Sequence, residues 1–224
     1  MADWLTYRAS DFLLFAPRTY YRLFALYNEA IWPAQILALF VGAAAFALLW
    51  RGRRSDGTAV VAILAAADLW IAWAYFFERY QTINWAAQYF AIGFIVQAVL
   101  LSFVGPSKQK PFRRATGMRR RIGLALFVFA LVLQPLIGPL LLHRPWQEIE
   151  LLGLAPDPTA VATLGALLLL LRGRALTCAM LLPLAWCAIS FLTLWTMGSP
   201  DAWAMPAVIG VATAAAAIPS QESE

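Results

Sequence analysis

Long runs of apolar residues alternate with short polar stretches along most of the chain. A helix needs roughly 20 mostly apolar residues to cross a bilayer, and only the run at 158–171 falls well short of that length. The pattern predicts an all-α fold, a polytopic transmembrane helical bundle of about seven spans. A re-entrant hairpin at the short run is the alternative, and it would change the sides of the later loops. The predicted spans are 31–50, 58–77, 85–104, 122–142, 158–171, 175–197 and 202–218.

The chain before the first span is amphipathic rather than continuously apolar. Arg18 and Arg22 lie on one side of the helix that the periodicity predicts. An additional span here would place both arginines near the middle of the bilayer, so we expect an interfacial amphipathic helix on the outer membrane surface. The expected organisation is an interfacial segment at 1–30, a transmembrane domain at 31–219 and a cytoplasmic tail at 220–224. The other side of the amphipathic helix carries Phe12, Phe15, Tyr20, Leu23 and Tyr27.

Seven spans separate the basic residues from most of the acidic ones. Alternate loops collect 12 of the 17 Lys and Arg residues on one side of the membrane. Because basic loops stay in the cytoplasm, this predicts an N-terminus outside and a C-terminus in the cytoplasm. Dropping or adding one span would mix the two groups. The 12 residues are Arg51, Arg53, Arg54, Lys108, Lys110, Arg113, Arg114, Arg119, Arg120, Arg121, Arg172 and Arg174.

The composition supports contact with lipid and argues against a self-sufficient enzyme. Hydrophobic residues make up 62% of the chain and charged residues 13%, against about 25% charged in an average soluble domain. The sequence has no phosphate-binding loop, no dinucleotide fingerprint and no cluster of Cys and His. Cys178 and Cys187 lie nine residues apart, which is neither a metal-binding nor a redox spacing. We therefore expect no cofactor, no metal and no enzymatic activity.

Asp68 is the most informative polar residue, because it lies near the middle of the second predicted span. A carboxylate at that depth costs roughly 2.5–3.5 kcal/mol, so it must be protonated, paired or in a wet interior. One interpretation is a proton or cation site, since acids inside the membrane are functional candidates by default. The other is a neutral acid that holds neighbouring helices together through a hydrogen bond.

Further polar residues follow Asp68 toward the outer surface. In an ideal α-helix, Tyr75, Glu78 and Arg79 lie within about a third of a turn of the side that carries Asp68. This arrangement predicts a polar stripe from the outer surface to mid-membrane. The alternative is a charged pair that ends the span at the interface.

Two other segments add candidate residues on the outer side. Glu29 and Gln35 flank the start of the first span and could join Asp68 in an outward-facing pocket, or they could belong to a capped helix start. His143 ends the fourth span, and Asp157 precedes Pro158 at the start of the fifth. An interfacial polar terminus and a helix N-cap are the alternatives for these two.

The loop at 106–121 carries seven basic residues and no acid. Such a loop determines topology and binds anionic lipid on the cytoplasmic side. Nothing else in the chain favours nucleic-acid binding. The partners we expect are therefore the lipid bilayer, with anionic lipid at this loop, and either another membrane protein or a second copy of the chain.

Several short blocks resemble an uncharacterised family of bacterial integral membrane proteins, the domain of unknown function numbered 6064. The resemblance covers nearly the whole chain from about residue 10. It implies a polytopic protein of the bacterial inner membrane and carries no established activity. The blocks are 27–35 (Tyr-Asn-Glu-Ala-Ile-Trp-Pro-Ala-Gln), 83–87, 135–138 with His143, 153–159 and 183–186.

Three functions remain open from the sequence. The first is transport of a small ion or polar solute through a polar site near Asp68. The second is a non-catalytic accessory, scaffold or assembly subunit of a membrane complex. The third, the least favoured, is a membrane enzyme that acts on lipid or quinone with His143 and Asp157 at the outer interface.

Overall fold

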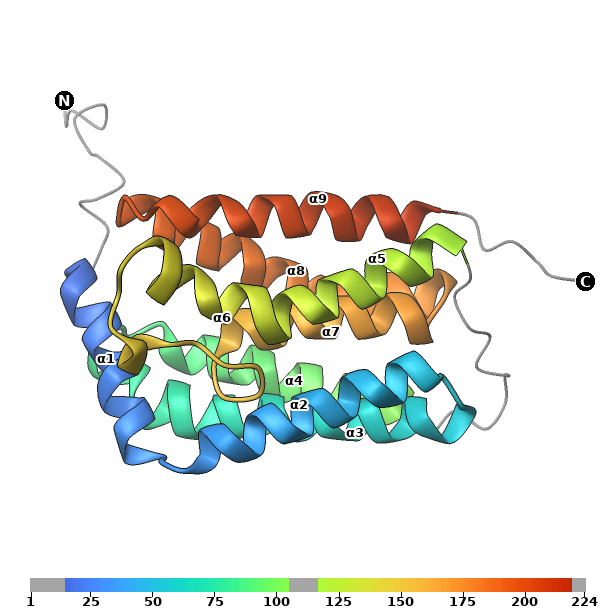
Figure 1. Cartoon of the computed structure of the whole chain (residues 1–224), viewed down its shortest axis with the longest axis horizontal. Coiled ribbons are helices and arrows are strands. Elements are labelled where there is room, and N and C mark those ends of the chain that lie inside the picture. Colours follow the sequence, from blue (N-terminus) through green and yellow to red (C-terminus); the bar gives the residue numbers. More distant parts are fainter. Residues whose placement is uncertain (1–14, 105–116, 219–224) are drawn as a thin grey trace, which may run out of the picture.

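The computed structural model describes residues 15–104 and 117–218, and it places their helices side by side along one long axis (Figure 1). The all-α prediction is confirmed for these residues. Phe12, most of the basic loop and the tail at 220–224 lie outside them. The α-helices are α1 (Pro17–Ala30), α2 (Ala34–Arg51), α3 (Arg54–Trp70), α4 (Ala87–Val104), α5 (Gly117–Val128), α6 (Gln134–Leu136), α7 (Pro156–Leu170), α8 (Gly173–Thr196) and α9 (Ala204–Ala217).

Two of the helical stretches contain π-helical segments. Ile71–Phe77 continues α3 without a break, and Phe129–Leu133 and Ile137–Leu141 flank α6 in one helix from Gly117 to Leu141. Pro135 and Pro139 lie in that second stretch and lack the N–H that a regular α-helix would use. Segments of this kind are frequent at functional sites.

Four helical stretches are long and apolar enough to cross a membrane, which points to a membrane location. Two shorter apolar helices, Ala87–Phe103 and Pro156–Leu170, lie beside them. The outer surface exposes large apolar side chains, as lipid contact requires. Among these are the tryptophans that the sequence places at the span ends, with exposed fractions of 61–67%: Trp32, Trp50, Trp85 and Trp203.

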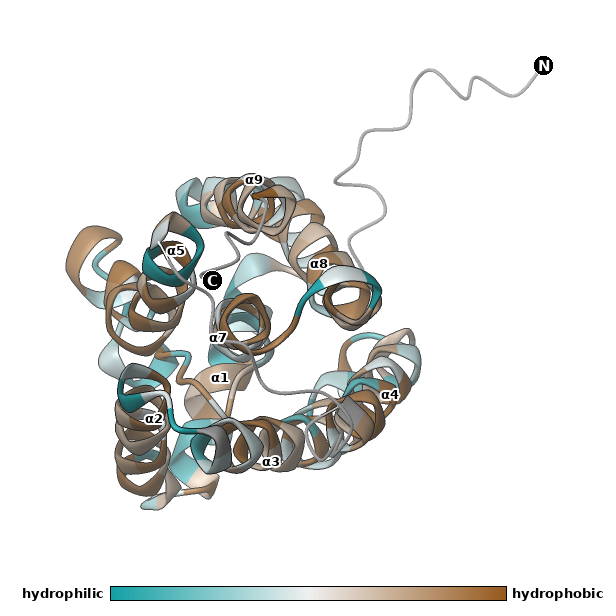
Figure 2. Cartoon of the chain, turned by 90° about the vertical axis from the view of Figure 1, so that its right-hand side faces the viewer, coloured by the Kyte–Doolittle hydropathy of each residue, from teal (hydrophilic) through white to brown (hydrophobic). Residues whose placement is uncertain are grey.

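Helix α7 lies at the centre of a ring formed by α2, α3, α4, α8, α9 and α5 (Figure 2). Every residue from Pro156 to Leu169 is buried. The helix has apolar residues all round, so it can be buried on all sides. The connection before it also turns inward, and its leucines Leu151, Leu152 and Leu154 are buried. A helix of only 15 residues therefore fills the axis of the bundle.

Helix α5 approaches α7 closely because two glycines meet. A Cβ atom at Gly165 would lie 2.6 Å from the carbonyl oxygen of Gly123, and one at Gly123 would lie 2.9 Å from that of Gly165. Small residues allow this approach in membrane bundles. Where α5 passes the C-terminal end of α7, Arg119 donates hydrogen bonds to the carbonyl oxygens of Leu168 (3.0 Å) and Leu171. Arg119 thus caps the C-terminus of the central helix, a role beyond the topological one expected from the sequence.

Helix α1 covers one end of the bundle (Figure 1). Its amphipathic pattern is as predicted, since Tyr20, Leu23 and Tyr27 are buried and Arg18 and Arg22 are exposed. The apolar side, which the sequence analysis expected at the membrane interface, packs instead on protein. Hydropathy alone cannot distinguish these two environments, because lipid and a protein core are equally apolar.

Candidate functional site

A cavity of about 150 Å³ lies between α3, α4, α7 and α8; we call it the Asp68 cavity. Of its lining residues, Tyr89 on α4 and Ala185 on α8 are exposed. The cavity therefore opens to the surface between these two helices, which are neighbours in the ring (Figure 2). Its floor carries the polar side chains of Asp68, Gln97 and Thr163.

The three polar side chains on this floor are deeply buried, and one oxygen of each lacks a partner. The exposed fractions of Asp68, Gln97 and Thr163 are 2%, 4% and 1%. Within the described residues, Asp68 Oδ2, Gln97 Oε1 and Thr163 Oγ1 have no hydrogen-bond partner. Leaving a buried polar group unsatisfied costs about 1–3 kcal/mol, so such groups in a native protein call for a specific explanation. All three residues line one cavity, so a rotation of their side chains would bring these oxygens to a partner bound there.

Gln97 is positioned by a proline on the facing helix. Pro183 lies inside α8 and has no N–H, so it leaves the carbonyl oxygen of Ala179 without its usual helical donor. Gln97 Nε2 donates to that oxygen at 3.2 Å. The bond ties α4 to α8 beside the cavity.

Aromatic rings form the wall of the Asp68 cavity. The rings of Phe90 and Phe94 each lie 5.4 Å from Trp186 and stand nearly perpendicular to it. The indole is held in place because its Nε1 donates to Asp157 Oδ1 at 2.7 Å. Tyr89 completes this wall at the mouth. The cavity thus combines a carboxyl group with an aromatic, mostly apolar surface.

The polar stripe expected above Asp68 does not continue in the structure. Tyr75 is buried, stacked at 5.0 Å on Phe24, whereas Glu78 is exposed. Neither these two residues nor Arg79 lines the Asp68 cavity. The reason is the π-helical segment Ile71–Phe77, because i→i+5 bonding changes the angular spacing that an ideal α-helix would give.

Glu29 and Gln35 also lie away from the Asp68 cavity. Glu29 is exposed at the end of α1. Gln35 is buried, and its Nε2 donates to the backbone oxygen of Asn28 at 2.6 Å. Asn28 in turn donates to the carbonyl oxygens of Gln147 and Ile149, both at 2.8 Å. This block therefore joins α1, α2 and the segment before α7.

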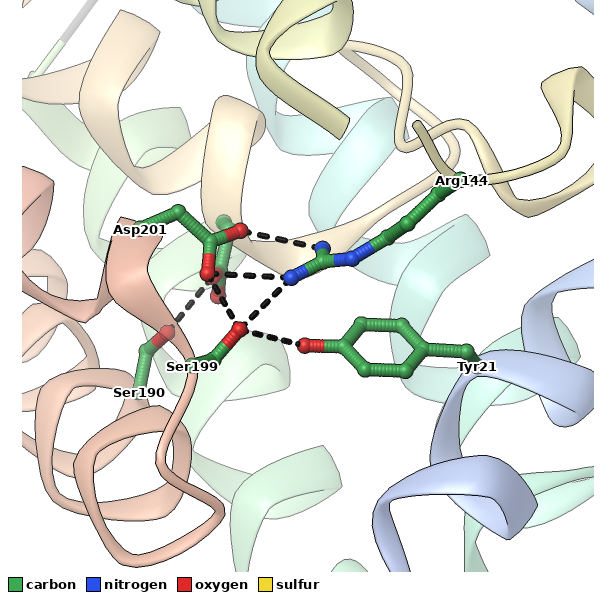
Figure 3. A network of polar contacts seen from close by, with 6 residues as sticks. Tyr21, Arg144, Ser190, Ser199 and Asp201 are labelled. Atoms are coloured by element: carbon green, nitrogen blue, oxygen red, sulfur yellow. Dashed lines mark hydrogen bonds and ion pairs between the residues drawn. The ribbon is translucent and has the colours of Figure 1, made fainter. Parts of the chain in front are cut away.

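A polar network holds together the end of the bundle that α1 covers (Figure 3). Arg144 forms a two-point ion pair with Asp201, at 3.0 and 3.1 Å, and also donates to Ser199 Oγ at 2.6 Å. Ser199 shares a hydrogen bond with the hydroxyl of Tyr21 at 2.9 Å. The guanidinium carbon of Arg144 lies 3.9 Å from the centre of the Tyr21 ring. Burial raises the pKa of Tyr21 to about 12, so its hydroxyl stays protonated in this network.

Beside this network lies a second cavity of about 40 Å³, which we call the Glu150 cavity. Asp157 lines it and accepts a hydrogen bond from Ser190 at 2.5 Å, in addition to the bond from Trp186. Glu150 also lines it, and its Oε2 has no partner among the described residues. Across residues 15–104 and 117–218, no group of three or more His, Cys, Asp or Glu side chains could hold a metal ion.

His143 is exposed and does not line the Glu150 cavity, which Asp157 lines. Its φ of 53° lies in the left-handed region, just after the helix that ends at Leu141. A residue in this conformation commonly ends a helix, and His adopts it more readily than most residues. The geometry therefore gives His143 a role in helix termination, next to Arg144.

We expect Glu150→Gln to stabilise the protein as the pH rises. Burial, then the charges of Asp157 and Asp201, raise the pKa of Glu150 well above its ordinary value. The unfolded chain loses this proton at a lower pH than the folded chain, so wild-type stability falls between the two pKa values. Glutamine cannot ionise and avoids that loss.

The measurement is thermal unfolding in detergent from pH 4 to pH 8. The melting temperatures of wild type and Glu150→Gln should nearly coincide at pH 4, and the variant should melt higher at pH 8. About 2–4 °C is expected for each 1 kcal/mol at this chain length. A constant difference across the pH range would contradict the assignment.

Sequence reasoning identified Asp68 and Asp157 but missed most of their surroundings. The sequence indicated a role for Gln97, since an amide in an apolar span commonly forms hydrogen bonds between helices. It also indicated an acceptor near Pro183, because a proline inside a span leaves a carbonyl oxygen without its helical donor. It indicated nothing for Thr163, since a threonine in an apolar helix is common. The pairing of Arg144 with Asp201, 57 residues apart, arises only from the fold.

Comparison with known proteins adds the family but no activity. No curated protein and no solved structure matches the chain. A family of unknown function, DUF6064, matches residues 18–222, which cover the helices described above apart from the first residue of α1. The resemblance seen in the short sequence blocks is thereby confirmed, and the chain belongs to the DUF6064 family of unknown function.

Proposed function

We propose that this chain is a bacterial inner-membrane protein with seven spans, an external N-terminus and a cytoplasmic C-terminus. Successive helices from α2 to α9 run up and down along one axis (Figure 1). The connections after α2 and α7 and the start of α5 lie at the end where α9 finishes, and they carry Arg residues. Clustering of basic residues at one end supports this orientation.

Within that architecture we propose transport of a small ion or polar solute, with Asp68 as the group that binds it. One observation carries the proposal, namely that three residues lining the Asp68 cavity each bury an oxygen without a hydrogen-bond partner among the described residues. Asp68, Gln97 and Thr163 all lie near the middle of their helices, which is mid-membrane depth for a seven-span bundle. Solute sites of membrane transporters lie at this depth.

The helices around the Asp68 cavity also have the irregular backbones that supply movement in transporters. Pro183 interrupts the hydrogen bonding of α8, and the π-helical segment Ile71–Phe77 begins three residues after Asp68. Broken or irregular helices are tolerated at membrane depth where protein or a cavity surrounds them. Both of these irregularities adjoin the site.

Ion flux in reconstituted liposomes tests the proposal. The protein is placed in vesicles loaded with a pH-sensitive dye, and a potassium diffusion potential drives proton uptake. We expect Asp68→Asn to lower the protein-dependent rate at least tenfold, because the amide cannot release a proton. Glu78→Gln is the matched control, since Glu78 is exposed and lies outside the cavity. Equal flux through wild type and Asp68→Asn would remove Asp68 from ion transport and favour the accessory role.

A further inference from the structure

We propose that the Asp68 cavity binds a primary organic ammonium ion whose apolar part is about the size of a benzene ring. This inference rests on the proposed function and names the class of solute. It follows from three properties of the site: which atoms lack partners, what forms the rest of the wall, and how much space there is.

The unpartnered atoms are all oxygens that can accept a hydrogen bond. They belong to a carboxyl group, an amide and a hydroxyl, on Asp68, Gln97 and Thr163. A primary ammonium group has three N–H donors and no acceptor. Its charge would also pair the carboxylate, which has no ion-pair partner among the described residues. An ammonium group in the cavity would therefore supply the donors that these three side chains lack, once their oxygens turn toward it.

The wall of the cavity is poorly suited to an inorganic metal cation. Phe90, Phe94, Tyr89 and Trp186 surround the space, together with aliphatic side chains. A calcium ion takes six to eight oxygen ligands, and hard cations in general prefer oxygen, whereas this site offers three side chains with a free oxygen. Aromatic faces attract organic cations, and they also pack well on an apolar body. The ligand should therefore be charged at one end and apolar at the other.

The volume limits the size of the apolar part. A cavity of about 150 Å³ accepts a molecule the size of benzene. A drug-sized ligand would need about 300 Å³ or more. Anions are disfavoured because no Lys, Arg or His belongs to the lining among the described residues. The mouth between α4 and α8 faces the lipid in the seven-span arrangement, so the apolar end can enter from the bilayer.

Calorimetric titration with two matched probes tests the inference. Benzylammonium and benzyl alcohol have the same ring, and only the first carries an ammonium group. The full chain in detergent micelles is titrated with each probe, and heats from protein-free micelles are subtracted. We expect benzylammonium to bind wild type at least about tenfold more tightly, since a hydrogen bond to a charged group contributes that much or more.

Two variants identify the atoms responsible. Asp68→Asn should remove the preference for benzylammonium, and Thr163→Val should reduce it several-fold. Thr213→Val, on the exposed side of α9, should leave it unchanged. Thermal unfolding of each variant confirms that it is folded.

Equal binding of the two probes by wild type would overturn the inference, as would a preference that survives in Asp68→Asn. The proposed function is judged separately by proton flux. If flux depends on Asp68 while benzylammonium shows no preference, the solute class is wrong and the transport proposal stands. If flux is independent of Asp68 while the preference depends on it, the cavity binds an ammonium ion without carrying protons.

Discussion

Gly165→Ala is expected to lower the melting temperature of the protein by about 3–10 °C in detergent. The added Cβ atom would lie 2.6 Å from the carbonyl oxygen of Gly123 and 3.0 Å from the backbone nitrogen of Phe127. Both are backbone atoms, so no side-chain rotation can relieve the contact, and α5 must move away from α7. Overpacking of this kind costs about 1–3 kcal/mol, which corresponds to the stated shift for a chain of this length.

Gly210→Ala is the matched control for this experiment. Gly210 also lies within a helix, α9, but a Cβ atom added there meets no heavy atom within 4 Å. Alanine is favoured over glycine inside a helix by about 0.5–1 kcal/mol, so this variant should melt at or above the wild-type temperature. If Gly165→Ala melted as high as Gly210→Ala, the close approach of α5 to α7 would be wrong.

Asp201→Ala is expected to destabilise the end of the bundle that α1 covers by about 2–3 kcal/mol. The side chains of Arg144 and Asp201 are only 17% and 16% exposed, so removing the carboxylate leaves a largely desolvated guanidinium unpaired. Breaking a fully buried pair costs about 3–5 kcal/mol, and the remaining exposure reduces the expected value. Ser199 also loses its acceptor, since it donates to Asp201 at 2.5 Å.

Thermal unfolding again provides the measurement, and Glu78→Ala is its control. Glu78 is an exposed acid, and surface substitutions of this kind usually change stability by less than about 0.5 kcal/mol. Asp201→Asn should fall between the two, because its amide oxygen still accepts a hydrogen bond from Arg144. An Asp201→Ala variant as stable as Glu78→Ala would show that the ion pair contributes nothing to the fold.

The helices themselves could be predicted from the sequence because their ends are chemically marked. The run predicted at 31–50 is α2 at Ala34–Arg51, and the run at 175–197 is α8 at Gly173–Thr196. Arg51 and Gly52 end the first, and Gly173 begins the second. Apolar runs and the charged or glycine residues that end them are local features, so the sequence alone shows where each helix begins and ends.

The arrangement around the candidate site could not be predicted in the same way. Hydropathy treats lipid and a protein core alike, so nothing in the apolar run of α7 showed that it faces protein on every side. The helical wheel placed Tyr75 beside Asp68 by assuming regular spacing, which the π-helical segment changes. The meeting of Asp68 with Gln97 and Thr163 depends on contacts between three helices that are distant in sequence.

The central position of α7 has a consequence for how the protein is made. Four helices of the ring, α2 to α5, leave the ribosome before α7 does, yet α7 provides the core on which α3 and α5 pack. Until residue 171 has been synthesised, Arg119 lacks the carbonyl oxygens that it caps, and the polar floor that Asp68 and Gln97 share with Thr163 is incomplete. Assembly is therefore concentrated in a late step of biogenesis, and the half-made chain must keep these polar groups in the bilayer without their final neighbours.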